Sequence, residues 1–307
     1  MVTDSLRAPS ASAQDDEILV LSESNVRDLR VPWDARYSRQ EISALVQSEP
    51  GLSLWNPRTG GYLLGSRWRH RDEIANVVDI VGPAVADQLL SAFIKLCAER
   101  GFELAVVAEY SERRRSSFYF AAGMEVIEDI IVYELGRIPP EYGGQVDLGS
   151  LSVAPINIED EREFEELLEV DHAAFPWLWW NSAGEFRNYA AVPGVKIEGF
   201  RDPTGRMIGY IGTTSLGSWG HLDRIAVHPD VQGRGLGRKL LIYSIARMKA
   251  FGARRVALST QQSNHVSRAL YESTGFRRSR AHDYRIYGRA LQGRELPGSW
   301  SKGPDEQ

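Results

Sequence analysis

The stretch VHPDVQGRGLGRKLL, residues 227–241, places glycines at alternate positions between an apolar run and a helix-like pattern; they are Gly233, Gly235 and Gly237. Glycine permits positive φ angles and leaves no Cβ in the way of a ligand. The first turn of a helix carries unpaired backbone N–H groups and the positive end of the helix dipole. The pattern therefore predicts a backbone nest for a phosphate or pyrophosphate, with added positive charge from Arg234, Arg238 and Lys239.

Two well-known phosphate loops do not fit these residues. A dinucleotide fingerprint needs glycine where Arg238 stands, and a Walker loop is broken by Arg238 and Leu240. The pattern Q-x-x-G-x-G does fit, and the segment N…ALYESTGF follows it from Asn264 onward. Together these motifs resemble the acyl-coenzyme A site of the GCN5-related N-acetyltransferase (GNAT) superfamily, over residues 150 to about 290. The alternative is a glycine-rich turn that binds no ligand.

The resemblance implies how acetyl-CoA, the acyl donor, is held. Backbone N–H groups of the loop would hold the coenzyme A pyrophosphate, with Arg238 at the helix start; the loop residues are Gln232, Gly233, Arg234, Gly235, Leu236 and Gly237. The preceding strand would lie along pantetheine and offer an N–H to the thioester carbonyl; its residues are Ile225, Ala226 and Val227. Asn264 would contact the pantetheine arm or its water.

The resemblance also implies proton-transfer residues. Tyr271 stands where the family has a tyrosine that protonates the departing thiolate, although a packing aromatic is the alternative. The acceptor amine must lose a proton to attack, and Asp223 lies near the place of a family glutamate. Because strand side chains alternate, Asp223 can face the wrong side and be structural, so His221 and Glu185 are alternative bases.

The stretch DHAAFPWLWWNS, residues 171–182, lies where this superfamily shapes its acceptor site. Its aromatic residues Trp177, Trp179 and Trp180 predict a wall for a cation or a flat group, with Glu185 nearby as a further substrate contact. The portion AAFPW resembles ribosomal-protein N-terminal alanine acetyltransferases. A lid or an interdomain contact is the alternative for the tryptophans. Asp171 and Glu185 are candidates to receive a cationic amine, although a solvated role is the main interpretation of each taken singly.

The elements that carry these motifs recur along the chain. Leu89 and Gly101 mark a helix and its glycine stop in the first half, as Leu240 and Gly252 do in the second. Similar echoes favour an α+β fold of two tandem GNAT-like domains, each a mixed, largely antiparallel sheet flanked by helices. The expected parts are a disordered tail (1–16), a degenerate GNAT-like domain (17–140), a linker (141–150), the catalytic domain (151–290) and a flexible tail (291–307).

The first copy lacks the glycine loop. Its counterpart, DIVGPAVADQLL, keeps only Gly82 and then has Pro83, which has no N–H to donate. We therefore expect no cofactor in this copy and an architectural role, such as closing one side of the acceptor cleft. Tyr119, opposite Tyr271, is expected to pack and not to act as an acid.

Composition limits the class of protein. A net charge of −5 argues against a nucleic-acid-binding protein, and the single Cys97 excludes intrachain disulfides and thiolate metal clusters. No apolar run reaches the roughly 18–20 residues that span a bilayer, so we expect a cytoplasmic protein, and the single cysteine also fits a reducing cytosol. No metal is expected. The expected activity is acetyl transfer by direct attack of a small-molecule amine or a peptide N-terminus, in the C-terminal domain. A non-catalytic acyl-CoA-binding or regulatory module, or a structural partner protein, is the alternative, and the oligomeric state is left open.

Overall fold

The computed structural model describes residues 18–110, 116–144 and 146–291. The chain forms two compact units: residues 1–65 with 78–96, and residues 66–77 with 97–307. The predicted tails lie outside the described residues except for Leu291. These compact units group the residues differently from the domains expected from the sequence, and the expected domain limits stay a prediction. No helix of the described residues is both long and apolar enough to cross a membrane.

The first unit is built around a small antiparallel hairpin system. Its strands are β1 (Leu19–Val20), β2 (Leu54–Trp55) and most of β3 (Tyr62–Arg67). Its helices are η1 (Val26–Asp28), α1 (Arg39–Ser48) and most of α2 (Ala86–Glu99). A capping box of Ser38 and Glu41 starts α1, and the buried Ile42 then packs with Leu21 and Tyr62.

The second unit holds one mixed sheet and carries the motifs. In order across the sheet, its strands are residues 74–77 of β4 (Ile74–Val81), β5 (Leu104–Glu109), β13 (Tyr284–Ala290), β6 (Glu125–Leu135), β11 (Arg255–Gln261), β10 (Trp219–Val227), β9 (Met207–Leu216), β8 (Val195–Arg201) and β7 (Ser152–Pro155). The pairs β4–β5 and β10–β11 are parallel, and the other pairs along this path are antiparallel. The short β12 (Arg277–Arg278) pairs with β6.

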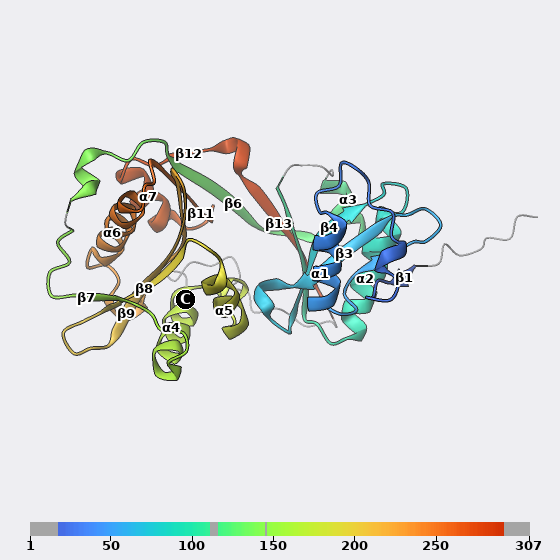
Figure 1. Ribbon diagram of the computed structural model, residues 1–307, viewed down its shortest axis with the longest axis horizontal. Helices are drawn as coiled ribbons and strands as arrows, with labels where there is room; N and C mark the ends of the chain where they lie inside the picture. The colour runs from blue at the N-terminus through green and yellow to red at the C-terminus, as the bar shows by residue number, and fades with distance from the viewer. Residues whose placement is uncertain (1–17, 111–115, 145, 292–307) are drawn as a thin grey trace, which may run out of the picture. The chain divides into compact units, whose positions relative to one another are not determined.

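Strands from the two halves of the sequence alternate in this sheet. The C-terminal strand β13 lies between β5 and β6, with Tyr287 opposite Val107. Strand β6 in turn pairs with β11, where Tyr133 lies opposite Leu258 (Figure 1). Because the first half supplies β6 to the sheet of the second half, its side chains can take part in a site built by the GNAT-like motifs.

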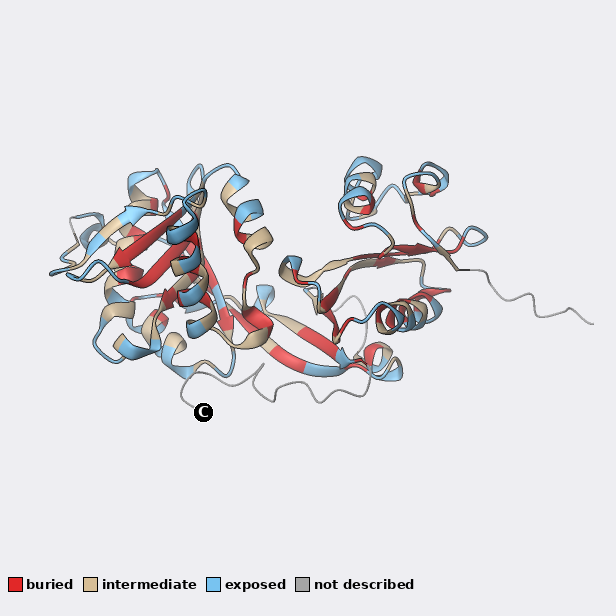
Figure 2. Ribbon diagram, turned by 90° about the horizontal axis from the view of Figure 1, so that it is seen from below, coloured by how far each residue is buried: buried red, intermediate tan, exposed pale blue. Residues whose placement is uncertain are grey.

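Helices cover both faces of the motif-bearing strands. Helices α6 (Leu236–Ala250) and α7 (His265–Ser273) pack on one face, where the predicted apolar spacing buries Leu240, Leu241, Ile245 and Met248. Helices α4 (Glu161–Ala174) and α5 (Ala183–Ala191) pack on the other face with Phe164 and Phe186. Figure 2 shows the buried residues concentrated in the strands and in the helix sides that meet them.

Short elements complete this unit. They are the helix α3 (Ser116–Ala121) and the 3-10 turns η2 (Trp68–His70), η3 (Pro140–Gly143), η4 (Trp177–Trp179), η5 (Pro229–Val231) and η6 (Arg280–His282). Two of them shape the site: η4 contains part of the tryptophan-rich stretch, and η5 leads into the glycine loop.

Candidate active site

The parallel strands β10 and β11 separate where the motifs begin. Their pairing runs from Trp219 and Arg255 to Leu222 and Leu258, although β10 continues to Val227 and β11 to Gln261. A cavity of about 630 Å³ opens there and is lined by the ends of both strands. Beyond Leu222, the backbone groups on this edge of β10 do not pair with β11, so they can form hydrogen bonds with a ligand.

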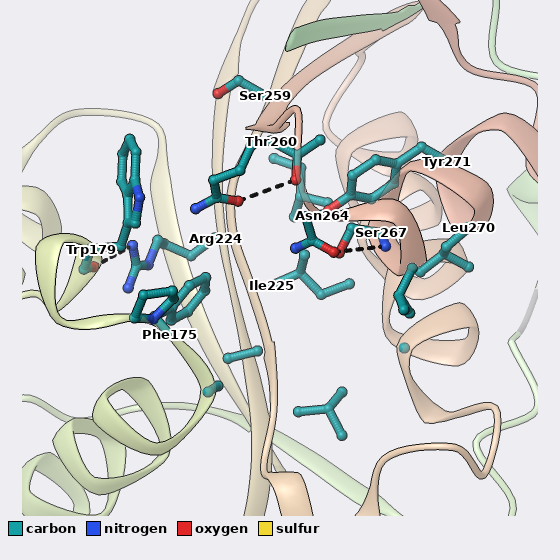
Figure 3. Close-up of a pocket in the computed structure, with 18 of the residues that line it drawn as sticks. Phe175, Trp179, Arg224, Ile225, Ser259, Thr260, Asn264, Ser267, Leu270 and Tyr271 are labelled. Carbon is teal, nitrogen blue, oxygen red and sulfur yellow. Dashed lines mark hydrogen bonds between the residues drawn. The ribbon is translucent and has the colours of Figure 1, made fainter. Parts of the chain in front are cut away.

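The cavity reaches both faces of the sheet. Phe175 and Trp179 line it on one side of the separated strands, and Asn264 and Tyr271 line it on the other (Figure 3). The predicted pantetheine strand, residues 225–227, borders the gap between them. A long ligand can therefore enter from the α6 and α7 side and present its end to the opposite side.

The glycine loop forms an open cradle at the start of α6. Gly233 and Gly235 have φ angles of 71° and 77°, and a Cβ added to either would meet no atom within 4 Å. Gly235 is the N-cap and supplies no side-chain hydrogen bond, and the first turn of α6 has no acidic residue. This open, electropositive helix start has the geometry of an anion-binding cradle, and its role in holding the pyrophosphate of coenzyme A stays a prediction.

Side chains around the loop have separate roles. Gln232 Nε2 donates to the Val227 carbonyl at 2.9 Å and so ties the loop to the end of β10. Gln232, Leu236 and Gly237 line the cavity, whereas Arg234 and Arg238 are exposed and are not among the lining residues. Arg238 donates to Ser273 Oγ at 3.0 Å, and Arg234 donates to the Asp230 carbonyl at 3.3 Å.

Helix α7 presents the predicted acid and its neighbour. Asn264 is the N-cap, and its side-chain oxygen accepts from the Ser267 N–H at 3.0 Å, which leaves its amide NH₂ as a donor. Tyr271 is 4% exposed and lines the cavity. Burial raises the pKa of Tyr271 to about 12, while a hydrogen bond with the Ser267 side chain acts in the opposite direction. The phenol is therefore protonated at neutral pH and can donate.

A β-bulge at Asp223 changes which side chains face which helices. The register of β10 against β9 shifts between Leu222 and Arg224. Leu222, Ile225 and Val227 consequently pack on the α6 side, and Ala226 packs on the α4 side. Simple alternation along β10 does not predict this arrangement.

The carboxylate of Asp223 lines the cavity but is engaged by three neighbours. Its Oδ2 accepts from the Tyr189 hydroxyl at 2.6 Å and from Thr214 Oγ1 at 2.7 Å. Its Oδ1 lies 2.7 Å from His221 Nδ1. The predicted role of Asp223 as base stays a prediction, and these contacts show that it positions Tyr189 and His221.

A buried ion pair, which the sequence analysis missed, lies beside the cavity. Arg224 is 8% exposed and donates to Asp171, to the Trp179 carbonyl at 3.0 Å and to the Tyr210 hydroxyl at 3.1 Å. The Arg224 guanidinium also lies 3.7 Å from the centre of the Phe175 ring. Asp171 is fully buried, so the expectation of a solvated Asp171 is wrong: the carboxylate is needed to compensate the buried guanidinium.

The predicted aromatic wall is only partly at the cavity. Trp179 is 7% exposed and lines it, whereas Trp177, Trp180 and Glu185 are not among the described lining residues. Trp180 stacks on His172 with ring centres 4.6 Å apart, and Trp177 covers the guanidinium of Arg71. Glu185 lies in the first turn of α5, with Oε2 3.7 Å from His70 Nε2. A substrate role for these three residues stays a prediction.

A segment of the first half of the sequence fixes the tryptophan stretch in place. Trp68 Nε1 donates to the Leu178 carbonyl at 2.8 Å, and Ser182 Oγ donates to the Arg69 carbonyl at 2.9 Å. Arg69 adopts a left-handed φ of 53° and lines the cavity. Burial and the nearby Arg224 lower the pKa of Arg69 to about 10, so Arg69 brings a positive charge to the cavity at neutral pH.

Glu128 is the second lining residue that the first half of the sequence supplies. It lies on β6, is 5% exposed, and its Oε2 has no hydrogen-bond partner among the described residues. Burial raises the pKa of Glu128 to about 7, and the Trp179 and Ser263 side chains act in the opposite direction. Its strand, EVIEDIIVYEL, carries four carboxylates, and periodicity alone did not distinguish Glu128 from the other three.

The sequence predicts neither a metal site nor a cysteine nucleophile. Within the described residues, no group of His, Cys, Asp or Glu is arranged to hold a metal ion. Cys97 is buried, and burial raises the pKa of its thiol to about 12. The thiol is therefore held in its protonated, weakly nucleophilic form.

Comparisons with known proteins agree with this geometry. Residues 154–276 match the model of the Acetyltransferase (GNAT) family. A mycothiol acetyltransferase of Actinosynnema mirum is 25% identical over 209 residues, which are 64% of this chain and 68% of that enzyme. The ribosomal protein bS18-alanine N-acetyltransferase of Escherichia coli is 34% identical over 104 residues, which are 34% of this chain and 66% of that enzyme. A second mycothiol acetyltransferase, from Geodermatophilus obscurus, matches over only 32% of its own length.

Solved structures share the fold over nearly the whole chain. A GCN5-related N-acetyltransferase from Sphaerobacter thermophilus has a TM-score of 0.60 at 15% identity, covering 92% of this chain and 98% of that one. A tandem GNAT protein from the clavulanic acid biosynthesis pathway has a TM-score of 0.60 at 15% identity, covering 91% and 99%. At this identity the likeness concerns the fold alone, and it confirms the expected class of tandem GNAT-like domains. Residues 154–276, which carry most of the cavity, therefore form a domain of the Acetyltransferase (GNAT) family.

Proposed function

We propose that the protein is an N-acyltransferase that moves acetyl from acetyl-CoA to an amine by direct attack, in the cavity between β10 and β11. The observation that carries the proposal is the separation of these strands beyond Leu222 and Leu258, beside the open glycine cradle at the start of α6. One ligand can place its pyrophosphate on the cradle and its thioester between the strands.

Each part of the donor meets a suitable group. The N–H groups of residues 232–237 hold the pyrophosphate, and the free edge of β10 at residues 225–227 hydrogen-bonds pantetheine. An N–H of the same edge stabilises the negative charge that develops on the thioester oxygen. Asn264 offers its amide NH₂ to the pantetheine arm.

Tyr271 supplies the proton for the leaving group. Its protonated hydroxyl faces the cavity from α7 and gives a proton to the sulfur as the C–S bond breaks. Holding the amine against the thioester supplies much of the remaining rate enhancement. The reaction needs no covalent enzyme intermediate, consistent with the buried, protonated Cys97.

The acceptor is proposed to be a small-molecule amine or a peptide N-terminus. The curated relatives are named for acetyl transfer to mycothiol or to an alanine of a ribosomal protein, and both classes fit an acceptor side that contains Trp179. A flat aromatic face contacts an alkylammonium or a peptide group favourably.

Calorimetric titration with acetyl-CoA tests the proposal. The wild-type protein is expected to bind one equivalent, and Gly235→Val is expected to lose binding because its side chain fills the cradle. Gly205→Val is the matched control, because Gly205 also has a positive φ (87°) and open space around its Cβ direction but lies in the β8–β9 turn. Absence of binding to the folded wild-type protein, or equal loss in both variants, contradicts the proposal.

Release of coenzyme A distinguishes an enzyme from a binding module. A panel of primary amines and alanine-initiated peptides is incubated with acetyl-CoA, and the free thiol is measured. An amine-dependent release that needs the intact loop supports transfer. Tight acetyl-CoA binding with no release across the panel favours the non-catalytic acyl-CoA-binding module.

A further inference from the structure

We propose that Glu128, supplied by the first half of the sequence, binds the acceptor ammonium and takes its proton, with the indole of Trp179 beside it. The inference rests on the proposed function and assigns the base that the GNAT-like motifs leave undetermined. It also gives the first half of the chain a part in catalysis.

The sheet register aims Glu128 into the acceptor side of the cavity. Gln261 of β11, Ile130 of β6 and Tyr284 of β13 are lateral partners, so they share one face of the sheet. Glu128 lies two residues from Ile130 on the same strand and also lines the cavity. Ile130, Trp179 and Tyr284 belong to one apolar cluster, which places Glu128 on the side of the strands that Trp179 covers.

Burial outweighs the groups near Glu128 that favour its charged form, the side chains of Trp179 and Ser263. The side chain is 5% exposed, and neither Glu128 Oε2 nor the indole Nε1 of Trp179 has a hydrogen-bond partner among the described residues. Buried polar atoms without partners are rare in folded proteins and call for an explanation. An acceptor with an ammonium group and an adjacent oxygen satisfies both atoms, because the ammonium donates to Glu128 and the oxygen accepts from Trp179.

Asp223 is less suited to the same task. Its two oxygens already accept from Tyr189 and Thr214 and contact His221. Taking a substrate proton would disturb these contacts, whereas Glu128 Oε2 has no hydrogen-bond partner among the described residues. Burial raises the pKa of Glu128 to about 7, which suits a group that must gain and release a proton near neutral pH.

The proton and bond changes balance with the residues at hand. The Glu128 carboxylate takes one proton from the ammonium, and the neutral amine attacks the thioester carbonyl carbon. The C–N bond forms and the C–S bond breaks, while the Tyr271 hydroxyl protonates the sulfur. The nitrogen then loses a second proton, which restores the Tyr271 hydroxyl through solvent, and Glu128 releases its proton to solvent after the amide leaves.

Other titratable or charged groups line the cavity and can influence any pH profile. They are Arg69, Asp223, Arg224, His265, Tyr271 and Tyr284, with Asp129 next to Glu128 in the strand. The test must therefore separate Glu128 from them by substitution and not by the wild-type profile alone.

The test compares Glu128→Gln with Glu134→Gln. Glu134 lies on the same strand, is 33% exposed at its side chain and is not among the described lining residues. Acetyl-CoA affinity is measured by calorimetry, and CoA release is measured from pH 5.5 to 8.5 with alanyl-glycyl-glycine and glucosamine as amine probes. Glu128→Gln is expected to keep the acetyl-CoA Kd within threefold and to lose about 100-fold in kcat/KM for the amine.

The pH profile separates proton transfer from a structural role. For wild type and Glu134→Gln, kcat/KM is expected to rise with pH as Glu128 loses its proton. For Glu128→Gln, this rise is expected to be absent. Glu128→Asp, which keeps a carboxylate, should recover part of the rate. If Glu128→Gln turns over within threefold of wild type, the inference is wrong although acetyl transfer stands. If the wild-type protein neither binds acetyl-CoA nor releases CoA, the proposed function fails and the inference with it.

Discussion

Arg224 and Asp171 form an ion pair that is closed off from solvent beside the proposed acceptor side of the cavity. The Asp171 carboxylate also accepts from the Tyr210 hydroxyl and from the Asn181 N–H, the latter at 2.9 Å. Arg224 in turn donates to the carbonyl of Trp179. The pair therefore connects β10, α4 and the tryptophan stretch, and it determines where Trp179 lies.

Removing one partner of this pair is expected to destabilise the fold strongly. Asp171→Asn leaves the Arg224 guanidinium buried without its counterion, which costs about 3–5 kcal/mol of unfolding free energy. Denaturant unfolding measures the loss. The control is Asp230→Asn, because the Arg206–Asp230 pair is 47% and 61% exposed at its side chains and is expected to contribute less than about 1 kcal/mol. If the two variants lose the same unfolding free energy, the buried pair contributes no more to stability than the exposed pair.

Gly237→Ala is expected to separate stability from cofactor binding. Gly237 lies in α6 without a positive φ, and an added Cβ would only touch the Leu270 side chain at 3.5 Å. Alanine stabilises a helix by up to about 1 kcal/mol relative to glycine, so thermal stability should rise. The methyl group occupies the wall of the cavity, so acetyl-CoA affinity should fall. A gain in stability with unchanged affinity would place the cofactor away from this loop.

Tyr271→Phe is expected to lower turnover and leave binding nearly unchanged. Loss of the acid should reduce kcat by about 100-fold, while the acetyl-CoA Kd changes little because the ring is kept. Tyr133→Phe is the matched control: Tyr133 is buried in the same cluster, 6.0 Å from Tyr271 between ring centres, and is not among the described lining residues. A kcat for Tyr271→Phe that equals that of the control would remove the acid role.

The buried carboxyl of Glu128 predicts a pH-dependent stability. The pKa of Glu128 is about 7 in the folded protein against an ordinary value of 4.5, so between these values the native state keeps a proton that the unfolded chain releases. Stability should therefore fall as pH rises through this window, by roughly 3 kcal/mol once Glu128 is ionised.

Glu128→Gln measures this contribution directly, because glutamine has the same shape and no charge. Its unfolding free energy should equal that of wild type near pH 4.5 and exceed it at pH 8. Unfolding curves of both proteins across this range give the difference. A constant difference at all pH values would mean that Glu128 does not titrate with a raised pKa.

The sequence by itself indicated the GNAT-like fold class and the motifs on the proposed cofactor side. The conformation of glycines, the start of a helix and the order of elements along the chain are local properties, so Gly233, Gly235 and Gly237 indicated an anion cradle without knowledge of the fold. The apolar spacing of Leu240, Leu241, Ile245 and Met248 likewise gave the buried side of α6. These patterns depend on neighbours a few residues apart.

The tertiary structure decided the acceptor side. Strand exchange places β6 beside β11 and so brings Glu128 to the cavity, and the contacts of residues 68–71 bring Arg69 there. The β-bulge at Asp223 shifts the alternation of side chains on β10. The pairing of Arg224 with Asp171 therefore could not be predicted from simple strand alternation. These relationships join residues far apart in the chain through register and packing, which no local periodicity encodes.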